Sequence, residues 1–201
     1  MNKIHPTAEV SAKAVLGDGT SVWNQAQVRE NSKIGKKCVI GKNVYVDFGV
    51  EIGDNCKVQN NCSVYHGSKI GNGVFLGPHC ILTNDKNPRA VNPDGSLKGN
   101  DDWNVASVRI KDGAALGAGT IITPGVIIGE WAMTGSGSVV TKNVPPHALV
   151  MGNPARVRGF VCKCGLKLKF RGKDARHAKM FCEKCDTETL IPTTDYEMMK
   201  P

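Results

Sequence analysis

Aliphatic residues recur at every sixth position through the first part of the chain, from Ile4 to Leu82. The series is Ile4, Val10, Leu16, Val22, Val28, Ile34, Ile40, Val46, Ile52, Val58, Val64, Ile70, Leu76 and Leu82. A period of six fits neither an amphipathic helix nor a strand with alternating apolar residues. Hexapeptide periodicity is typical of a parallel β-helix, in which short strands stack coil upon coil. We therefore predict an all-β solenoid.

The remaining positions of each hexad predict how a coil is built. A small or β-branched residue stands four places after each aliphatic residue, from Ala8 to Cys80, and is expected to share the interior of the prism. Three hexads would make one triangular coil, and coils would stack at roughly 4.8 Å, the spacing of paired strands. Several aliphatic residues are followed directly by glycine, which we expect to adopt corner conformations that a Cβ disfavours. These glycines are Gly17, Gly35, Gly41, Gly53, Gly71 and Gly77.

The repeat is interrupted once. Leu82 and the next aliphatic residue in the series, Ile110, are 28 residues apart, which is not a multiple of six. The intervening segment, about residues 83–109, is rich in Asn, Asp, Gly and Pro, as expected for a loop ejected from the solenoid. Insertions in solenoids map to loops that often carry function, so this loop is the leading candidate for the site.

The composition changes after Arg158. We predict a β-helix domain over residues 1–158 and a cysteine-rich tail over residues 159–201. Two close cysteine pairs can supply four thiolates to one tetrahedral Zn²⁺, although the first pair is separated by only one residue. So short a segment builds little core of its own, which favours a structural metal over a redox dithiol or a metal-free remnant. The predicted ligands are Cys162, Cys164, Cys182 and Cys185.

The chain is basic, with 26 Lys and Arg against 18 Asp and Glu and a formal net charge of +8. This balance suggests anionic partners such as phosphorylated cofactors, nucleotide sugars or nucleic acid. No signal peptide is visible and no apolar run reaches the roughly 20 residues of a membrane span, so we expect a cytoplasmic protein with reduced thiols. The cysteines of the small interior register are predicted to be buried small hydrophobes. They are Cys38, Cys56, Cys62 and Cys80.

Three features resemble the hexapeptide-repeat, left-handed β-helix acyltransferases: the hexads, the break Thr83-Asn84…Pro88-Arg89, and the closing segment Gly152-Asn153-Pro154-Ala155-Arg156. Within that superfamily, the chain is most similar to N-acetyltransferases that act on nucleotide-linked 3-amino sugars. The closest group is the UDP-2-acetamido-3-amino-2,3-dideoxy-glucuronate N-acetyltransferases of surface polysaccharide synthesis. The resemblance covers about residues 4–160 well and the tail loosely. It implies left-handed winding, acetyl-CoA as co-substrate, and a homotrimer with three active sites between neighbouring prisms.

The resemblance also implies roles for individual residues. Asn84 would contact the reacting amine or the thioester, while Asp85 and Arg89 would bind the substrate or hold the loop. Five further residues would contact the coenzyme along its length, from the pantetheine to the nucleotide end, with the cations near phosphates. They are Ala118, Gly135, Lys142, Asn153 and Arg156.

The residue before the loop proline bears on the acceptor. In the branch that acetylates sugar hydroxyls a histidine stands there, whereas this chain has Asn87. A hydroxyl needs a general base, but a partly neutral amine can attack a thioester directly once it is positioned. This difference favours an amine acceptor. Sugar O-acetylation stays an alternative because a base could come from elsewhere, and His66 and His79 are the candidates.

Two further classes compete with an acetyltransferase. The γ-class carbonic anhydrases share the prism but need three metal-binding histidines on adjacent coils, and only His66 and His79 lie in the later coils of the first block. The other alternative is a non-catalytic β-helix whose basic zinc ribbon binds a partner. No interleaved aromatic face accompanies the basic residues of the tail, so we expect no nucleic-acid partner.

Overall fold

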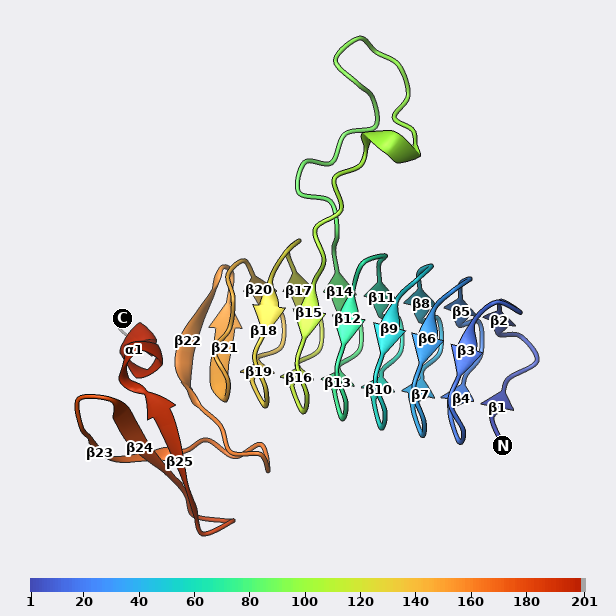
Figure 1. The fold of residues 1–201 in the computed structure, drawn as a ribbon. Coiled ribbons are helices and arrows are strands. Elements are labelled where there is room, and N and C mark those ends of the chain that lie inside the picture. The colour runs from blue at the N-terminus through green and yellow to red at the C-terminus, as the bar shows by residue number, and fades with distance from the viewer. Residues whose placement is uncertain (200–201) are drawn as a thin grey trace.

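The computed structural model describes residues 1–199 and shows a three-sided parallel β-helix followed by a small antiparallel sheet (Figure 1). Each hexad contributes one two-residue strand. Before the loop, it pairs in parallel with the strand eighteen residues later, as Lys3 does with Ser21. Across the loop the step is 40 residues, as from Lys69 to Arg109. Each coil therefore uses three hexads. The predicted all-β solenoid of hexapeptide repeats is confirmed.

The strands form three faces, one for each hexad of a coil. The first face contains β1 (Lys3–Ile4), β4 (Ser21–Val22), β7 (Val39–Ile40), β10 (Lys57–Val58), β13 (Phe75–Leu76), β16 (Ala115–Leu116) and β19 (Met133–Thr134). The second contains β2 (Glu9–Val10), β5 (Gln27–Val28), β8 (Tyr45–Val46), β11 (Ser63–Val64), β14 (Ile81–Leu82), β17 (Ile121–Ile122) and β20 (Val139–Val140). The third contains β3 (Val15–Leu16), β6 (Lys33–Ile34), β9 (Glu51–Ile52), β12 (Lys69–Ile70), β15 (Arg109–Ile110) and β18 (Ile127–Ile128).

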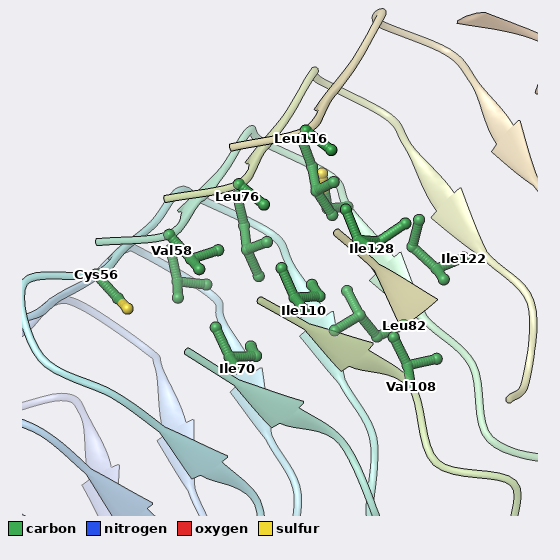
Figure 2. Close-up of a cluster of buried hydrophobic side chains, with 14 of the residues drawn as sticks. Cys56, Val58, Ile70, Leu76, Leu82, Val108, Ile110, Leu116, Ile122 and Ile128 are labelled. Carbon is green, nitrogen blue, oxygen red and sulfur yellow. The ribbon is translucent and has the colours of Figure 1, made fainter. Parts of the chain in front are cut away.

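The interior is filled by the aliphatic series that the hexads predicted. From Val22 onward these side chains are almost completely buried in one continuous core. Figure 2 shows aliphatic side chains from the three faces gathered inside the prism. Those labelled are Val58, Ile70, Leu76, Leu82, Val108, Ile110, Leu116, Ile122 and Ile128. Their burial supplies the main hydrophobic stabilisation of the solenoid.

The four solenoid cysteines are buried and free, as predicted. Their thiols also donate hydrogen bonds to glycine carbonyls at the corners. The Sγ of Cys56 lies 3.0 Å from the Gly71 carbonyl oxygen, and the Sγ of Cys62 lies 3.0 Å from that of Gly77. A small residue with a weak donor therefore suits this register, because it fills a narrow space and satisfies a buried acceptor.

The conformation expected for the glycines that follow the aliphatic residues was wrong. None of the six has a positive φ; the left-handed corner lies two residues further on, as at Asn55 and Gly73. The structure gives another reason for glycine at these positions. A Cβ on Gly53 would lie 2.8 Å from the backbone carbon of Gly71 in the next coil. The close approach of stacked coils, rather than a left-handed backbone, requires glycine there.

Substituting Gly53 by alanine is therefore expected to destabilise the solenoid by about 1–3 kcal/mol, the cost of overpacking a tight contact. Gly73→Asn is the matched control, because Gly73 has φ +64° with nothing within 4 Å of its Cβ position, and asparagine tolerates this conformation. Urea unfolding of both variants measures the difference. Equal stability of the two variants would contradict the explanation by coil contact.

The predicted loop leaves the prism between β14 and β15 and projects away from it (Figure 1). Antiparallel bridges pair Asp85 with Val105 and Val91 with Leu97, so the two arms of the loop run side by side. A 3₁₀ turn, η1 (Asn100–Asp102), lies in the returning arm. The ejected loop of the prediction is confirmed.

Beyond the last coil, the chain forms the antiparallel pair β21 (Ala148–Gly152) and β22 (Ala155–Phe160). A three-stranded antiparallel sheet follows, with β23 (Lys169–Lys173), β24 (His177–Cys182) and β25 (Thr187–Pro192). The chain then turns through α1 (Thr193–Tyr196) and η2 (Glu197–Met199). β22 crosses the domain boundary predicted at residue 158, and the core continues from the solenoid into the tail. None of the helices described has the length and apolar character needed to span a lipid bilayer.

Candidate active site at the loop corner

A cleft of about 640 Å³ lies where the loop leaves the prism, at the corner between the second and third faces. We call it the loop-corner cleft. It is lined by Arg29, Glu30, Tyr45, Asp47, Phe48, Tyr65, His66, Asn84, Trp103 and Val105. Because one coil takes eighteen residues, residues at that spacing stack on one another. Arg29, Asp47 and Tyr65 form one such row. Glu30, Phe48 and His66, each the next residue along the chain, form a second row that ends at Asn84. Trp103 and Val105 come from the loop.

The carboxyl group of Asp47 organises the floor of this cleft. Its side chain is 9% exposed. Its Oδ1 accepts hydrogen bonds from Arg29 Nη1 at 3.0 Å and from the Tyr45 hydroxyl at 2.9 Å. The backbone N–H of Phe48 donates to the same oxygen at 2.8 Å, and that of His66 donates to Oδ2 at 3.1 Å. One carboxyl group therefore connects three consecutive coils.

Arg29 and Glu30 extend this network toward solvent. Arg29 Nη2 lies 2.7 Å from Glu30 Oε1. Hydrogen bonds with Tyr45 and then with Glu30 raise the pKa of the Arg29 guanidinium, and a backbone hydrogen bond and then Arg29 lower the pKa of the Glu30 carboxyl. Burial raises the pKa of the Tyr45 phenol, which stays a hydrogen-bond donor at neutral pH. The floor thus combines one cation with two carboxyl groups.

His66 is held with one ring nitrogen available to a ligand. Its Nδ1 lies 2.8 Å from the Phe48 carbonyl oxygen. Because a carbonyl only accepts, Nδ1 carries the hydrogen, and in the neutral ring Nε2 keeps its lone pair. The ring also stacks on Phe48, with centroids 3.9 Å apart and planes 15° apart. These contacts give the cleft an oriented imidazole with a free proton acceptor.

Asn84 lies beside His66, so the structure brings two of the three predicted catalytic residues together. The Asn84 side-chain Nδ2 donates to the His66 carbonyl oxygen at 3.2 Å, and the residue is 8% exposed. This bond fixes which end of the amide is the donor and leaves Oδ1 as an acceptor. An acceptor beside an imidazole suits a ligand that carries N–H groups.

The other two loop residues of the prediction lie outside the cleft. Asp85 Oδ1 accepts the backbone N–H of Asn87 at 2.8 Å, which shapes the turn at the base of the loop. Arg89 is exposed on the loop, and its Nη1 donates to the Pro88 carbonyl at 2.9 Å. Within one chain, the Arg89 guanidinium therefore does not line the cleft.

His79 lies on a different corner, the one between the first and second faces. It occupies a left-handed corner position with φ 62°, and its Nε2 lies 3.3 Å from Asn61 Nδ2. Ala118 and Gly135, two of the residues predicted to contact the coenzyme, lie on this same corner. Ala118 lies between β16 and β17, and Gly135 lies between β19 and β20. The two turns stack, since the Gly137 N–H donates to the Ala118 carbonyl. The predicted residues of one site therefore fall on two separate corners of the prism.

The remaining coenzyme candidates lie near the C-terminal end of the prism. Lys142 and Arg156 both line a second cleft of about 240 Å³, which we call the end cleft. Asn153 lies in the turn between β21 and β22, and its bond to Pro154 is cis. Asn153 does not line the end cleft.

The four tail cysteines come together as their spacing predicted. Their Sγ atoms all lie within 4.8 Å of one another, and those of Cys164 and Cys182 are 3.6 Å apart. A tetrahedral Zn²⁺ with Zn–S bonds of about 2.3 Å requires sulfurs about 3.8 Å apart. The donor set and its geometry therefore fit this metal.

Most residues of the loop-corner cleft escaped prediction. They are Arg29, Glu30, Tyr45, Asp47, Phe48, Tyr65, Trp103 and Val105. A signal was present in the hexads: polar and aromatic pairs follow the inward aliphatic residue at positions 29, 47 and 65, at eighteen-residue intervals directly before the break. Aligning the sequence in steps of one coil, eighteen residues, rather than in steps of one hexad would have placed these residues beside Asn84.

Comparisons with known proteins agree with this architecture. The model of the hexapeptide repeat of succinyl-transferase matches residues 32–66, and the bacterial transferase hexapeptide model, which has six repeats, matches residues 107–142. The chain is a hexapeptide-repeat protein, and a transferase hexapeptide repeat is matched on each side of the loop.

Individual relatives narrow the comparison to acetyltransferases. The dTDP-3-amino-3,6-dideoxy-alpha-D-galactopyranose 3-N-acetyltransferase of Aneurinibacillus thermoaerophilus is 57% identical over 61 residues, which cover 30% of this chain and 32% of that protein. The match thus spans about a third of the relative. PerB of Caulobacter crescentus, solved with CoA and GDP-perosamine, is 26% identical with a TM-score of 0.51, covering 79% of this chain and 57% of PerB. A maltose O-acetyltransferase of Clostridium difficile 630 is 30% identical with a TM-score of 0.50, covering 61% and 69%. The resemblance to hexapeptide-repeat acyltransferases, and among them to amino-sugar N-acetyltransferases, is confirmed.

Proposed function

We propose that this protein transfers an acetyl group from acetyl-CoA to the amino group of a nucleotide-linked amino sugar. The observation that carries the proposal is the loop-corner cleft, where a free imidazole nitrogen, an amide oxygen and two carboxyl groups surround one space. This set suits an amine, which arrives as a cation, must lose a proton and donates hydrogen bonds. The N-acetyltransferase relative and the PerB complex support the same reaction.

Each polar residue of the cleft has a separate role in the proposed reaction. The carboxyl groups of Glu30 and Asp47 favour the sugar ammonium group, and Asn84 Oδ1 orients its N–H bonds. His66 Nε2 accepts a proton, and the amine lone pair attacks the thioester carbonyl carbon, forming the C–N bond while the carbonyl π electrons move to oxygen. Collapse of this intermediate breaks the C–S bond. The nitrogen of the intermediate still carries one proton more than an amide nitrogen does, and this proton passes to the CoA thiolate as it leaves. The products are the amide, free CoA and a protonated His66.

The acceptor is proposed from the resemblance as a UDP-linked 3-amino sugar, in a cytoplasmic pathway that supplies lipopolysaccharide or another surface polysaccharide. Acetylation of a sugar hydroxyl is the second candidate, because the maltose O-acetyltransferase shares the fold and His66 could serve a hydroxyl as base. Asn87 before the loop proline favours the amine.

The decisive experiment incubates the protein with acetyl-CoA and a panel of UDP-, dTDP- and GDP-linked amino sugars while free thiol is measured. Each amino sugar is paired with its 3-hydroxy counterpart as the control for O-acetylation, and mass spectrometry locates the acetyl group. We expect thiol release with a 3-amino sugar and none with its hydroxyl counterpart. Release with the hydroxyl sugars alone would favour the second candidate, and no release with any sugar would overturn both.

We further propose that the active protein is a homotrimer. The predicted site residues lie on two corners of one prism, so a complete site requires the loop corner of one copy to face the Ala118–Gly135 corner of another. Light scattering should give three times the mass of the chain. Inactive His66→Asn and Ala118→Trp chains should regain activity when co-expressed, because some interfaces then carry neither change. A monomeric active enzyme would contradict this proposal.

The cysteine cluster is proposed to bind one structural Zn²⁺. Purified protein should contain about one equivalent of zinc by elemental analysis, as four thiolates in this geometry form a closed site. Cys164→Ser should lose the metal and lower the melting temperature. The control is Cys56→Ser, which changes a buried solenoid thiol without touching the cluster and should keep zinc at the wild-type level. Zinc-free protein of unchanged stability would contradict a structural role for the metal.

A further inference from the structure

The end cleft combines positive charge with apolar walls, as a nucleotide site does. Its only charged lining residues are Lys142 and Arg156, and neither forms an ion pair within residues 1–199. Asn143 is its one neutral polar lining residue, and valine, alanine and methionine side chains line the rest. Two uncompensated cations beside an apolar surface suit a ligand that joins phosphates to a flat ring.

One wall of this cleft comes from the far end of the chain. Among residues 1–199, Met198 in η2 is the only lining residue beyond Val157. Every other lining residue belongs to the last coil or to the hairpin β21–β22. The cysteine-rich tail therefore returns to the solenoid and contributes to a pocket that the solenoid alone leaves open.

The tail holds Met198 in place through its neighbour Tyr196. The Tyr196 ring stacks on Phe160 of β22, with centroids 6.3 Å apart, and on Phe170 of β23, with centroids 5.2 Å apart. Lys173 of β23 forms an ion pair with Glu197 at 3.6 Å. The position of η2 thus depends on the position of the antiparallel sheet.

The cysteine cluster adds a second link between the solenoid and that sheet, beside the apolar core that they share. Cys162 lies two residues after the end of β22, Cys182 ends β24, and Cys185 lies in the turn before β25. A metal bound to these thiols would join the end of the solenoid to the turn between β24 and β25. A sheet of three short strands has little core of its own, so this link matters for its position.

We infer that the tail is a structural part of the coenzyme site: the cysteine cluster, with its metal, holds Met198 against the 3′-phosphoadenosine end of coenzyme A in the end cleft. The identity of this ligand rests on the proposed function. Lys142 and Arg156 bind the phosphates, and Met198 contacts the adenosine. Loss of the metal consequently weakens coenzyme binding and leaves binding at the loop-corner cleft unchanged.

The test measures binding to the full chain by calorimetry, with coenzyme A, adenosine 3′,5′-bisphosphate and UDP as separate probes. Met198→Asp puts a carboxylate beside the phosphates and should weaken both coenzyme probes by about tenfold or more, with UDP affinity unchanged. Leu190→Asp is the matched control, because Leu190 is an equally exposed tail residue, 52% against 47% for Met198, that does not line the end cleft. Protein stripped of zinc by a chelator should behave like Met198→Asp and recover when zinc is restored.

The outcomes separate this inference from the proposed function. Wild-type affinity for coenzyme A in Met198→Asp would overturn the role of the tail while leaving acetyl transfer intact. If wild-type protein binds neither coenzyme A nor the bisphosphate, the proposed function fails first. Should metal removal unfold the whole chain, the two aspartate variants still decide the question, because both retain the cysteines.

Discussion

Replacing His66 with asparagine is expected to lower kcat by about 10²–10⁴-fold, the usual loss when a general base is removed. Asparagine can still donate to the Phe48 carbonyl, so the local structure should survive while the proton acceptor disappears. The KM values for both substrates should change little. Steady-state kinetics with both substrates varied provides the measurement.

The matched control for this prediction is His147→Asn. Like His66, His147 has its Nδ1 close to a backbone carbonyl, 2.9 Å from the Val161 oxygen, but it lies outside the loop-corner cleft. It should keep wild-type kcat. His79→Asn then compares the two candidate bases directly. A larger loss of kcat in His79→Asn than in His66→Asn would move the base to the other corner and overturn the assignment.

Replacing Asp47 with alanine is expected to have the largest effect on stability in the cleft, roughly 3 kcal/mol or more. The change removes the acceptor of four hydrogen bonds, which leaves the Tyr45 hydroxyl and the backbone N–H groups of Phe48 and His66 without their partner. Activity should fall with it, because the segment from residues 47 to 48 supports the His66 ring. Chemical denaturation and activity measured on the same samples test both effects.

Glu30→Gln is the control for Asp47→Ala. Glu30 also contacts Arg29, at 2.7 Å, but its side chain is 38% exposed, so water replaces the contact and the stability should change little. Asp47→Asn is an intermediate case, because its amide keeps one acceptor oxygen. This variant should lose less stability than Asp47→Ala. Equal stability of the alanine and glutamine variants would show that the buried carboxyl does not organise the floor.

The six-residue period by itself determined the solenoid, its interior and its single interruption. The reason is local: the direction of each side chain follows from its place in the hexad, and a loop out of register cannot be wound into a coil. The sequence also predicted that the four tail cysteines come together, because their spacing is typical of residues that bind one metal. Asn84 was predicted from the family resemblance of the break, and His66 was one of two histidines, with His79, in the later coils of the first block.

Only the tertiary structure decided which residues share a corner. Arg29 and Asn84 lie 55 positions apart in the sequence and line one cleft, because residues one coil apart stack regardless of their chemistry. His79, closer to Asn84 in sequence, lies on another corner, since a few residues further along the chain lead to a different face. Met198 lines the same cleft as Lys142 only because the tail sheet turns back, and that turn depends on packing between elements far apart in the chain. Side-chain direction is set within one hexad, whereas the composition of a site depends on how the coils stack and how the tail packs against the last of them.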